Sequence, residues 1–321
     1  MKSFLVYIRF VLNLNTINIT IQEDNPSFQI RPLESRDISF ITKWSRNEGF
    51  APGAGDVSIY RHTDNQGLWV GCLDTRPIGC IAGVRYNSNY GFIGLFLVIK
   101  PYRGLGYGVR LWKHALNHLS DLPCIGLEAA PERISDYETW GFRASSLTTR
   151  WKLCSENALS RPSTSLHIFK DFINLQLLED SQIPESAVYS YDAKREPSPR
   201  PHFISDWLHH PAGKVLALVD SNRKCHGFGR IRPCLLKNGK GWRIGPLIAD
   251  SNELARFLID QLIYRHPGNI LIDSPGLNTN SYEFFQSYGF EKISETLRMY
   301  RGFSPSTSMS DVYGLACLEL G

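Results

Sequence analysis

Hydrophobic and polar positions alternate and regroup along the chain in a pattern that predicts short strands and helices in succession. From residue 28 the chain alternates as a strand does, and Ser35 to Glu48 carries apolar residues at helical spacing. Further elements of this first half are expected as strands over 67–74, 77–86 and 90–100, a helix over 109–119, a strand over 124–130, a short helix over 132–139 and a closing strand.

The signal weakens between 154 and 182, where RPSTS is typical of a linker, and then the pattern starts again. The second half is expected to hold helices over 203–208, 252–264 and 280–288 and strands over 215–220, 226–234, 241–250, 268–274 and 291–300.

The two halves match element by element. IGLFL (93–97) corresponds to IGPLI (244–248), and Gly141-Phe142 corresponds to Gly289-Phe290. This similarity predicts a degenerate internal repeat, two copies of one fold. We expect an N-terminal extension (1–27), a first domain (28–153), a linker (154–182), a second domain (183–303) and a tail (304–321).

Composition narrows the possible functions. The net charge of +4 on 321 residues is too small to imply nucleic-acid binding. Seven scattered cysteines without C-x-x-C pairs favour reduced thiols and a cytoplasmic protein, and no metal-ligand spacing is present.

The apolar run Met1 to Leu14 is interrupted by Arg9 and is too short to span a bilayer. We interpret it as an extension and expect no membrane partner; export or a membrane-surface anchor is the alternative.

The segment from Val98 to Trp112 carries the strongest chemical signal. A buried strand ends, a loop contains Gly104, Gly106 and Gly108, and a helix begins. Glycines allow tight turns and close approach of backbone amides, and the helix N-terminus adds unpaired N–H groups. Together these features predict a cradle for a pyrophosphate. Arg103 either adds positive charge to this cradle or holds the loop in shape.

Three interpretations of this loop compete. It could be a glycine-rich turn without a ligand. It could belong to a dinucleotide fold, because Glu128 lies 20 residues after Gly108, but that fingerprint requires G-x-G-x-x-G. The third interpretation is the R-G-x-G-x-G loop of the GCN5-related N-acetyltransferases, which this stretch closely resembles. One residue, Tyr102, separates Pro101 from Arg103, where that family usually has two.

The resemblance extends from about residue 28 to 302. Tyr137 stands four residues before Gly141-Phe142, as in many members of the family, although Ala130 replaces a frequent asparagine. In the second half Asn278 and Phe285 fill the asparagine and tyrosine positions, and Ala249-Asp-Ser-Asn252 replaces the glycine-rich loop. Its motifs resemble the C-terminal domain of the YitH-like, holothin-acyltransferase-type family: Tyr191-Asp192, Arg200 with Phe203 and Trp207, 227–232, 245–247 and 298–302.

The resemblance implies an α+β fold with two tandem acetyltransferase-like domains, each a mixed, mainly antiparallel sheet flanked by helices. It implies an N-acyltransferase that uses acetyl-coenzyme A, without a metal, and a small-molecule amine as acceptor, with a protein amine as an alternative. The cofactor residues would be Val98, Arg103, Gly104, Leu105, Gly106, Tyr107 and Gly108.

The resemblance also implies the roles of individual residues in direct transfer. The Val98 amide would polarise the thioester carbonyl, and Tyr137 would protonate the departing thiolate, unless Tyr137 only packs beside Gly141. Glu128 would act as base, directly or through water, or bind the substrate ammonium. A strand-end acid paired with an arginine is the alternative for Glu128. The competing class is a non-catalytic coenzyme A-binding or partner-binding scaffold.

Overall fold

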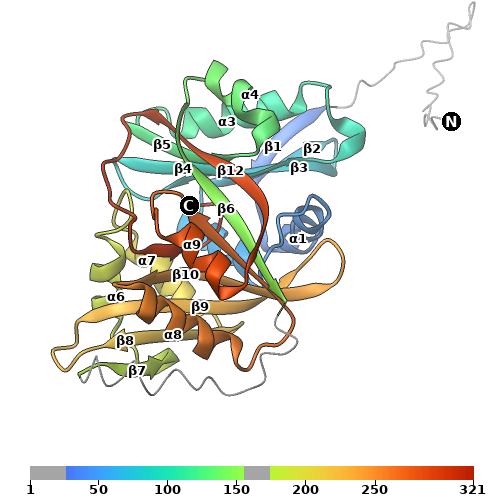
Figure 1. Ribbon diagram of the computed structural model, residues 1–321. Coiled ribbons are helices and arrows are strands. Elements are labelled where there is room, and N and C mark those ends of the chain that lie inside the picture. Colours follow the sequence, from blue (N-terminus) through green and yellow to red (C-terminus); the bar gives the residue numbers. More distant parts are fainter. Residues whose placement is uncertain (1–26, 155–173) are drawn as a thin grey trace, which may run out of the picture.

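The protein is described by a computed structural model that covers residues 27–154 and 174–321. Figure 1 shows two halves, one above the other, with the long strands β6 (Arg143–Cys154) and β12 (Glu291–Gly302) crossing between them. The predicted extension lies outside the described residues except for residue 27, and so does most of the predicted linker. Within the described chain, no helix has both the length and the hydropathy needed to cross a bilayer.

The first half follows the predicted order of strands and helices and adds one helix, α2. Before β6, its elements are β1 (Phe28–Pro32), α1 (Ile38–Asn47), α2 (Asp56–Thr63), β2 (Leu68–Leu73), β3 (Arg76–Arg85), β4 (Tyr90–Val98), α3 (Tyr107–His118), β5 (Cys124–Ala129) and α4 (Ile134–Thr139). Helix α3 forms because its apolar residues recur on one face, and that face is buried against the sheet. Helices α3 and α4 pack on one side of the sheet, whereas α1 and α2 pack on the other.

The second half repeats this plan, as the sequence predicted. Its elements are β7 (Gln176–Glu179), α6 (Glu185–Asp192), α7 (Pro201–His209), β8 (Lys214–Val219), β9 (Cys225–Leu235), β10 (Lys240–Ala249), α8 (Asn252–Ile263), β11 (Asn269–Pro275), α9 (Ser281–Tyr288), β12 and β13 (Val312–Gly314). The sequence did not predict α6 or β13. Trp151 from the first half completes the core of the second, where it stacks on Phe285 with ring centroids 5.5 Å apart.

The two halves share one continuous sheet, because their last long strands change places. β12 comes from the second half but lies between β5 and β6, and β6 comes from the first half but pairs with β11. Each half therefore needs a strand from the other to complete its sheet.

The segment expected to be a tail, residues 304–321, contributes to the fold. β13 pairs with β10, and the residues after it are buried between the halves. Polar residues between Ser304 and Asp311 resemble a tail in sequence, whereas the apolar side chains that follow pack into the core. The buried side chains of this segment are Leu315, Ala316, Cys317 and Leu320.

Candidate active site

The sheet of the first half opens between β4 and β5. These strands pair in parallel from Tyr90–Cys124 to Ile93–Leu127 and no further. Just beyond, Leu95 has φ of 47°, and the register of β4 against β3 shifts. This bulge bends β4 away from β5. On the side of β4 that faces β5, no strand of the described chain pairs with β4 beyond Ile93, so the two strands diverge there. We call the space between their diverging ends the slot.

The backbone amide of Val98, which is predicted to polarise the thioester carbonyl, points toward this slot. Ile99 donates its amide to Ile78 on β3 at 2.9 Å, and Val98 is paired opposite Gly79. Since alternate residues of an antiparallel pair direct their backbone groups to opposite sides, Val98 directs its N–H and C=O away from β3.

The glycine-rich loop has the geometry of an anion cradle. Gly104 and Gly106 have φ of 76° and 83°, and a Cβ at either position would meet no atom within 4 Å. Gly106 is the N-cap of α3, so the amides that follow it have no partner within the helix. Leu105 is exposed, and the Tyr107 ring packs on Phe28 with centroids 4.9 Å apart. The backbone is therefore open to a phosphate at the helix N-terminus.

Arg103 holds the loop in place. Its Nε donates to the Val98 carbonyl at 2.7 Å, and its Nη2 lies 2.7 Å from Oε1 of Glu48, which follows α1. The guanidinium thus ties the cradle to the end of β4. Gly108 faces the sheet, where a Cβ would be 3.4 Å from the Phe96 ring.

Tyr137 lies on the α3 side of the slot. Its ring is 5.0 Å from that of Trp112 on α3, and Trp112 is 5.8 Å from Phe96 on β4. Burial raises the pKa of the Tyr137 hydroxyl, so the group keeps its proton at neutral pH.

Glu128 faces the opposite side, between the two halves, because its neighbours Leu127 and Ala129 pack toward α3. Its carboxylate accepts hydrogen bonds from Arg298 Nε (2.6 Å), Thr296 Oγ1 (2.7 Å) and Thr148 Oγ1 (3.0 Å). The Glu128 side chain is 2% exposed. Tyr137 and Glu128 therefore lie on opposite faces of the sheet at the slot. Arg298 holds the Glu128 carboxylate.

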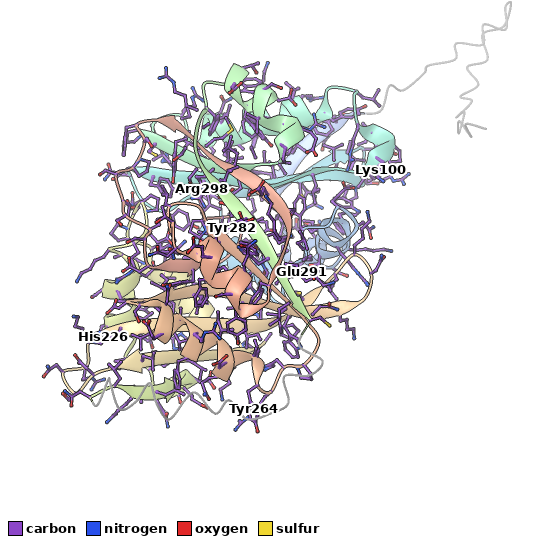
Figure 2. All side chains as sticks on the ribbon, in the orientation of Figure 1. Lys100, His226, Tyr264, Tyr282, Glu291 and Arg298 are labelled. Carbon is purple, nitrogen blue, oxygen red and sulfur yellow. The ribbon has the colours of Figure 1, made fainter. Side chains whose placement is uncertain are left out.

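The sequence analysis gave pairing with an arginine as the alternative for Glu128, and the structure shows that pair, with Arg298; it identified neither this arginine nor the two threonines. Arg298 and Thr296 come from β12, which the strand exchange brings beside β5, and Arg298 lies directly opposite Glu128. Figure 2 shows Arg298 near the middle of the molecule and Lys100 at the outer end of β4. The R-M-Y-R-G motif at 298–302 contains that arginine, but the motif alone does not show that it pairs with Glu128.

The second half closes the equivalent slot with its own chain. β10 and β11 pair in parallel as far as Ile244–Ile272, the position that matches Ile93 in the repeat. Beyond it β13 pairs with Leu247 and Ile248 of β10, and Asn278 Nδ2 donates to the carbonyl of Val312 in β13 at 3.2 Å.

The turn that replaces the glycine-rich loop in the second half is acidic. Asp250 there accepts hydrogen bonds from Tyr191 (2.7 Å) and Arg195 (2.9 Å) and contacts His226 (2.9 Å). A carboxylate at this helix N-terminus repels a phosphate. Both the slot and the cradle are thus absent from the described second half.

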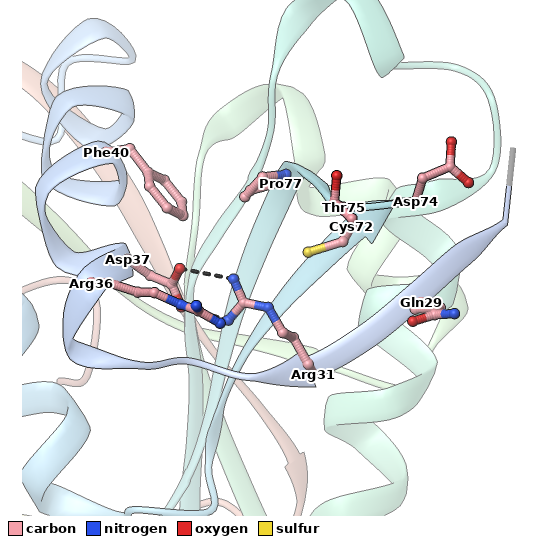
Figure 3. A pocket seen from close by; sticks show the side chains of 9 residues that line it. All are labelled: Gln29, Arg31, Arg36, Asp37, Phe40, Cys72, Asp74, Thr75 and Pro77. Atoms are coloured by element: carbon pink, nitrogen blue, oxygen red, sulfur yellow. Dashed lines mark hydrogen bonds and ion pairs between the residues drawn. The ribbon is translucent and has the colours of Figure 1, made fainter.

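One cavity of about 530 Å³ lies elsewhere, on the α1 side of strands β1 to β3 (Figure 3). Its arginine Arg31 is held by Asp37 at 2.6 Å and 2.8 Å. None of the predicted site residues lines it. Across the described ranges, no group of three or more His, Cys, Asp or Glu side chains is arranged to hold a metal.

A splayed parallel pair, a bulge beside it and a glycine-rich helix start are the features by which acetyltransferase-type folds hold an acyl donor. Two family models agree with this class. The acetyltransferase (GNAT) family matches residues 34–142, and the acetyltransferase (GNAT) domain matches residues 188–314.

Relatives match across most of the chain. Holothin acyltransferase of Pseudoalteromonas sp. (strain SANK 73390) is 26% identical, over 94% of this chain and 97% of its own. The uncharacterized N-acetyltransferase YitH of Bacillus subtilis (strain 168) is 23% identical, over 76% and 81%. A crystal structure of a candidate acetyltransferase from Pyrococcus horikoshii superposes with a TM-score of 0.73 at 20% identity, covering 95% and 98%.

The chain belongs to the GNAT family and carries two tandem GNAT domains. The predicted α+β fold and the internal repeat are confirmed. Membership in this family makes the protein an acyltransferase that draws on an acyl-coenzyme A donor.

Proposed function

We propose that the protein transfers an acetyl or other short acyl group from acyl-coenzyme A to a small-molecule amine, in a ternary complex formed in the first half. The contrast between the halves carries the proposal. β4 has no strand partner beyond Ile93 on the β5 side within the described chain, whereas β10 has β13 at the matching position. A slot and an anion cradle occur together only in the first half as described.

The residues present fit the donor. The amides from Arg103 to Gly108, with Leu105 and Tyr107 between the glycines, would hold the pyrophosphate. The Val98 amide, directed into the slot, would hold the carbonyl oxygen as negative charge develops on it. The donor supplies an activated acyl group, and the chain supplies position and hydrogen bonds.

Tyr137 would donate a hydrogen bond to the departing sulfur. A phenol with a pKa of about 10 and a thiol with a pKa of about 8.5 differ by roughly 1.5 units, and burial raises the pKa of Tyr137 further. The hydroxyl therefore stabilises the leaving group without complete loss of its proton. The acceptor amine would approach from the opposite face, where Glu128 and Arg298 lie.

A cytoplasmic location stays a prediction. The seven cysteines are free, and six of them are buried, which suits a reducing compartment.

A screen of acyl-coenzyme A donors against amines, with thiol release followed in time and products identified by mass spectrometry, tests the proposal. We expect amide products that depend on both substrates. A chain that binds coenzyme A but acylates no amine would instead support a binding scaffold.

A further inference from the structure

β4, the strand that borders the slot, carries no acidic side chain between Tyr90 and Val98. Formation of an amide removes a proton from the attacking nitrogen, and a side chain within hydrogen-bond reach, or one water away, can accept it. A carboxylate that serves the slot from the face between the halves must therefore come from another element that packs on this strand.

Residues 315–321 bring a carboxylate to this strand. The backbone of Glu319 packs on Gly94, the first residue of β4 beyond its pairing with β5, and leaves no room for a Cβ there. Gly94 lies on the same face of β4 as Phe92, whose ring contacts the Arg298 guanidinium between the halves. Figure 1 shows the last residues of the chain between the halves. The Glu319 carboxylate therefore lies within one side-chain length of the point where the slot begins.

Glu319 is held more loosely than the neighbouring carboxylates. Its Oε2 accepts from the Tyr60 hydroxyl at 3.1 Å and lies 3.7 Å from Arg243 Nη1. Among the described residues, no donor is bonded to its other oxygen, Oε1. Asp56 and Asp273, by contrast, each accept at least two hydrogen bonds from arginines at 2.6–3.0 Å. Oε1 is therefore open to an N–H donor from a substrate.

The charges around Glu319 balance while its carboxylate is ionised. Three arginines and three carboxylates form this buried cluster, namely Arg150, Arg232 and Arg243 with Asp56, Asp273 and Glu319. The other titratable groups that face Glu319 stay neutral, because burial raises the pKa of the Tyr60 hydroxyl and raises that of the Cys317 thiol to about 12. Arg243 keeps its 2.6 Å bond to Asp273, so Glu319 can gain a proton without leaving an arginine unpaired.

Glu196 is the alternative carboxyl group. Burial raises its pKa to about 7, although Arg200 and Arg298 favour its ionised form. Its Oε1 accepts from Arg200 at 2.6 Å, and Ser198 in the same loop bonds to the first half before β4 begins. The slot begins further along β4, where Glu319 packs. Position relative to the slot therefore favours Glu319.

We propose that Glu319 accepts the proton of the acceptor amine during acyl transfer, directly or through one water. This inference rests on the proposed function. The nitrogen lone pair forms the C–N bond to the thioester carbonyl carbon, and the C–S bond breaks with its electron pair on sulfur. One N–H proton passes to a Glu319 oxygen, and coenzyme A leaves as a thiolate that Tyr137 stabilises. The thiolate then takes a proton from solvent and Glu319 returns one, so the protons balance.

Glu319→Gln tests this assignment in the full-length protein, because its amide oxygen can still accept from Tyr60. The substrate is the amine that the screen acylates fastest, with saturating acyl-coenzyme A. We expect kcat/KM at pH 8 to fall by about 100-fold or more, while the Kd for acyl-coenzyme A stays constant. The deficit should narrow as pH falls, because a protonated Glu319 in the wild type cannot accept a proton either.

Two further variants separate proton transfer from an effect on folding. Glu319→Asp keeps a carboxylate and should retain the shape of the wild-type pH profile at a reduced rate. Glu196→Gln removes the alternative carboxyl group and should also keep that shape. A wild-type rate in Glu319→Gln, a deficit that is equal at every pH, or a profile that changes only in Glu196→Gln would overturn the proposal.

The proposed function and this inference fail in different ways. If the wild-type protein acylates no amine, both are wrong. If the wild type acylates amines and Glu319→Gln does so equally well, the proposed function stands and only the assignment of Glu319 is wrong.

Discussion

Glu319 lies with its backbone carbonyl against Gly94 of β4, so closely that a Cβ at Gly94 would be 1.7 Å from the Glu319 oxygen. Gly94 directly follows the last residue of β4 that pairs with β5. The C-terminal segment, which reads as a tail in the sequence, therefore packs on the strand where the slot begins.

Gly94→Ala should destabilise the protein, because Gly94 is fixed in a strand and the turn that carries Glu319 is buried between the halves, so neither backbone can move without disturbing the packing. We expect a loss of about 1–3 kcal/mol and a melting temperature lower by roughly 3–10 °C, measured by thermal unfolding. Gly108→Ala is the control. Gly108 lies in helix α3, and an added Cβ there would be 3.4 Å from the Phe96 ring, an ordinary contact. Because alanine favours a helix more than glycine does, the stability of this variant should be unchanged or raised. Equal melting temperatures for the two variants would show that the C-terminal segment is not packed as described.

Asp273 links the halves through Arg150 and Arg243, and these arginines hold its pKa at about 2. A depressed carboxyl pKa contributes stability that is present above about pH 4 and is lost as pH falls toward 2. Asp273→Asn should therefore cost about 3–5 kcal/mol at pH 7, with a difference from wild type that narrows below pH 4. Urea unfolding at pH 7, 4 and 3 measures this.

The exposed pair Arg133–Asp136 provides the control for that series. Asp136→Asn should change stability by less than about 1 kcal/mol at each pH. A constant difference between Asp273→Asn and wild type from pH 7 to 3 would contradict the assigned ionisation of Asp273.

Arg103→Ala should weaken donor binding, because the loop loses its bonds to Val98 and Glu48. We expect the KM for acyl-coenzyme A to rise about tenfold, with a smaller effect on kcat, in steady-state kinetics. Arg85→Ala, which removes a surface ion pair with Asp121, should leave both constants unchanged. A normal KM in Arg103→Ala would remove Arg103 from the cradle.

Tyr137→Phe should lower kcat by about 10–100-fold while the Kd for acyl-coenzyme A stays constant, because the hydroxyl acts on the leaving sulfur. Since burial raises the pKa of Tyr137, its ionisation should not shape the rate profile between pH 6 and 9, and the variant should keep the wild-type profile there. Single-turnover kinetics separate chemistry from product release. A wild-type rate of the chemical step would remove Tyr137 from the mechanism.

Local signals predicted the cradle and most elements of both halves. Glycines at 104 and 106 adopt positive φ, and the apolar face of α3 is buried, because both properties are encoded within a dozen residues. The strand exchange could not be predicted in this way. β12 has the same alternation whichever strands it joins, and its pairing with β5 depends on contacts 170 residues apart.

The partners of Glu128 were missed for the same reason. The sequence marked Glu128 and Arg298 separately, and only the exchanged strand brings them to 2.6 Å. The C-terminal segment was missed because its polar beginning resembles a tail, while burial of Leu315 and Leu320 depends on the interface between the halves.

The stoichiometry of acyl-coenzyme A binding, measured by isothermal titration calorimetry on the full-length protein, tests the central claim most directly. We predict one site per chain. Gly106→Val should abolish binding, because a branched side chain fills the cradle and strains a backbone with φ of 83°. Asp250→Asn, at the matching turn of the second half, should leave binding unchanged. Two sites per chain, or one site that survives in a folded Gly106→Val variant, would contradict the assignment of the donor to the first half.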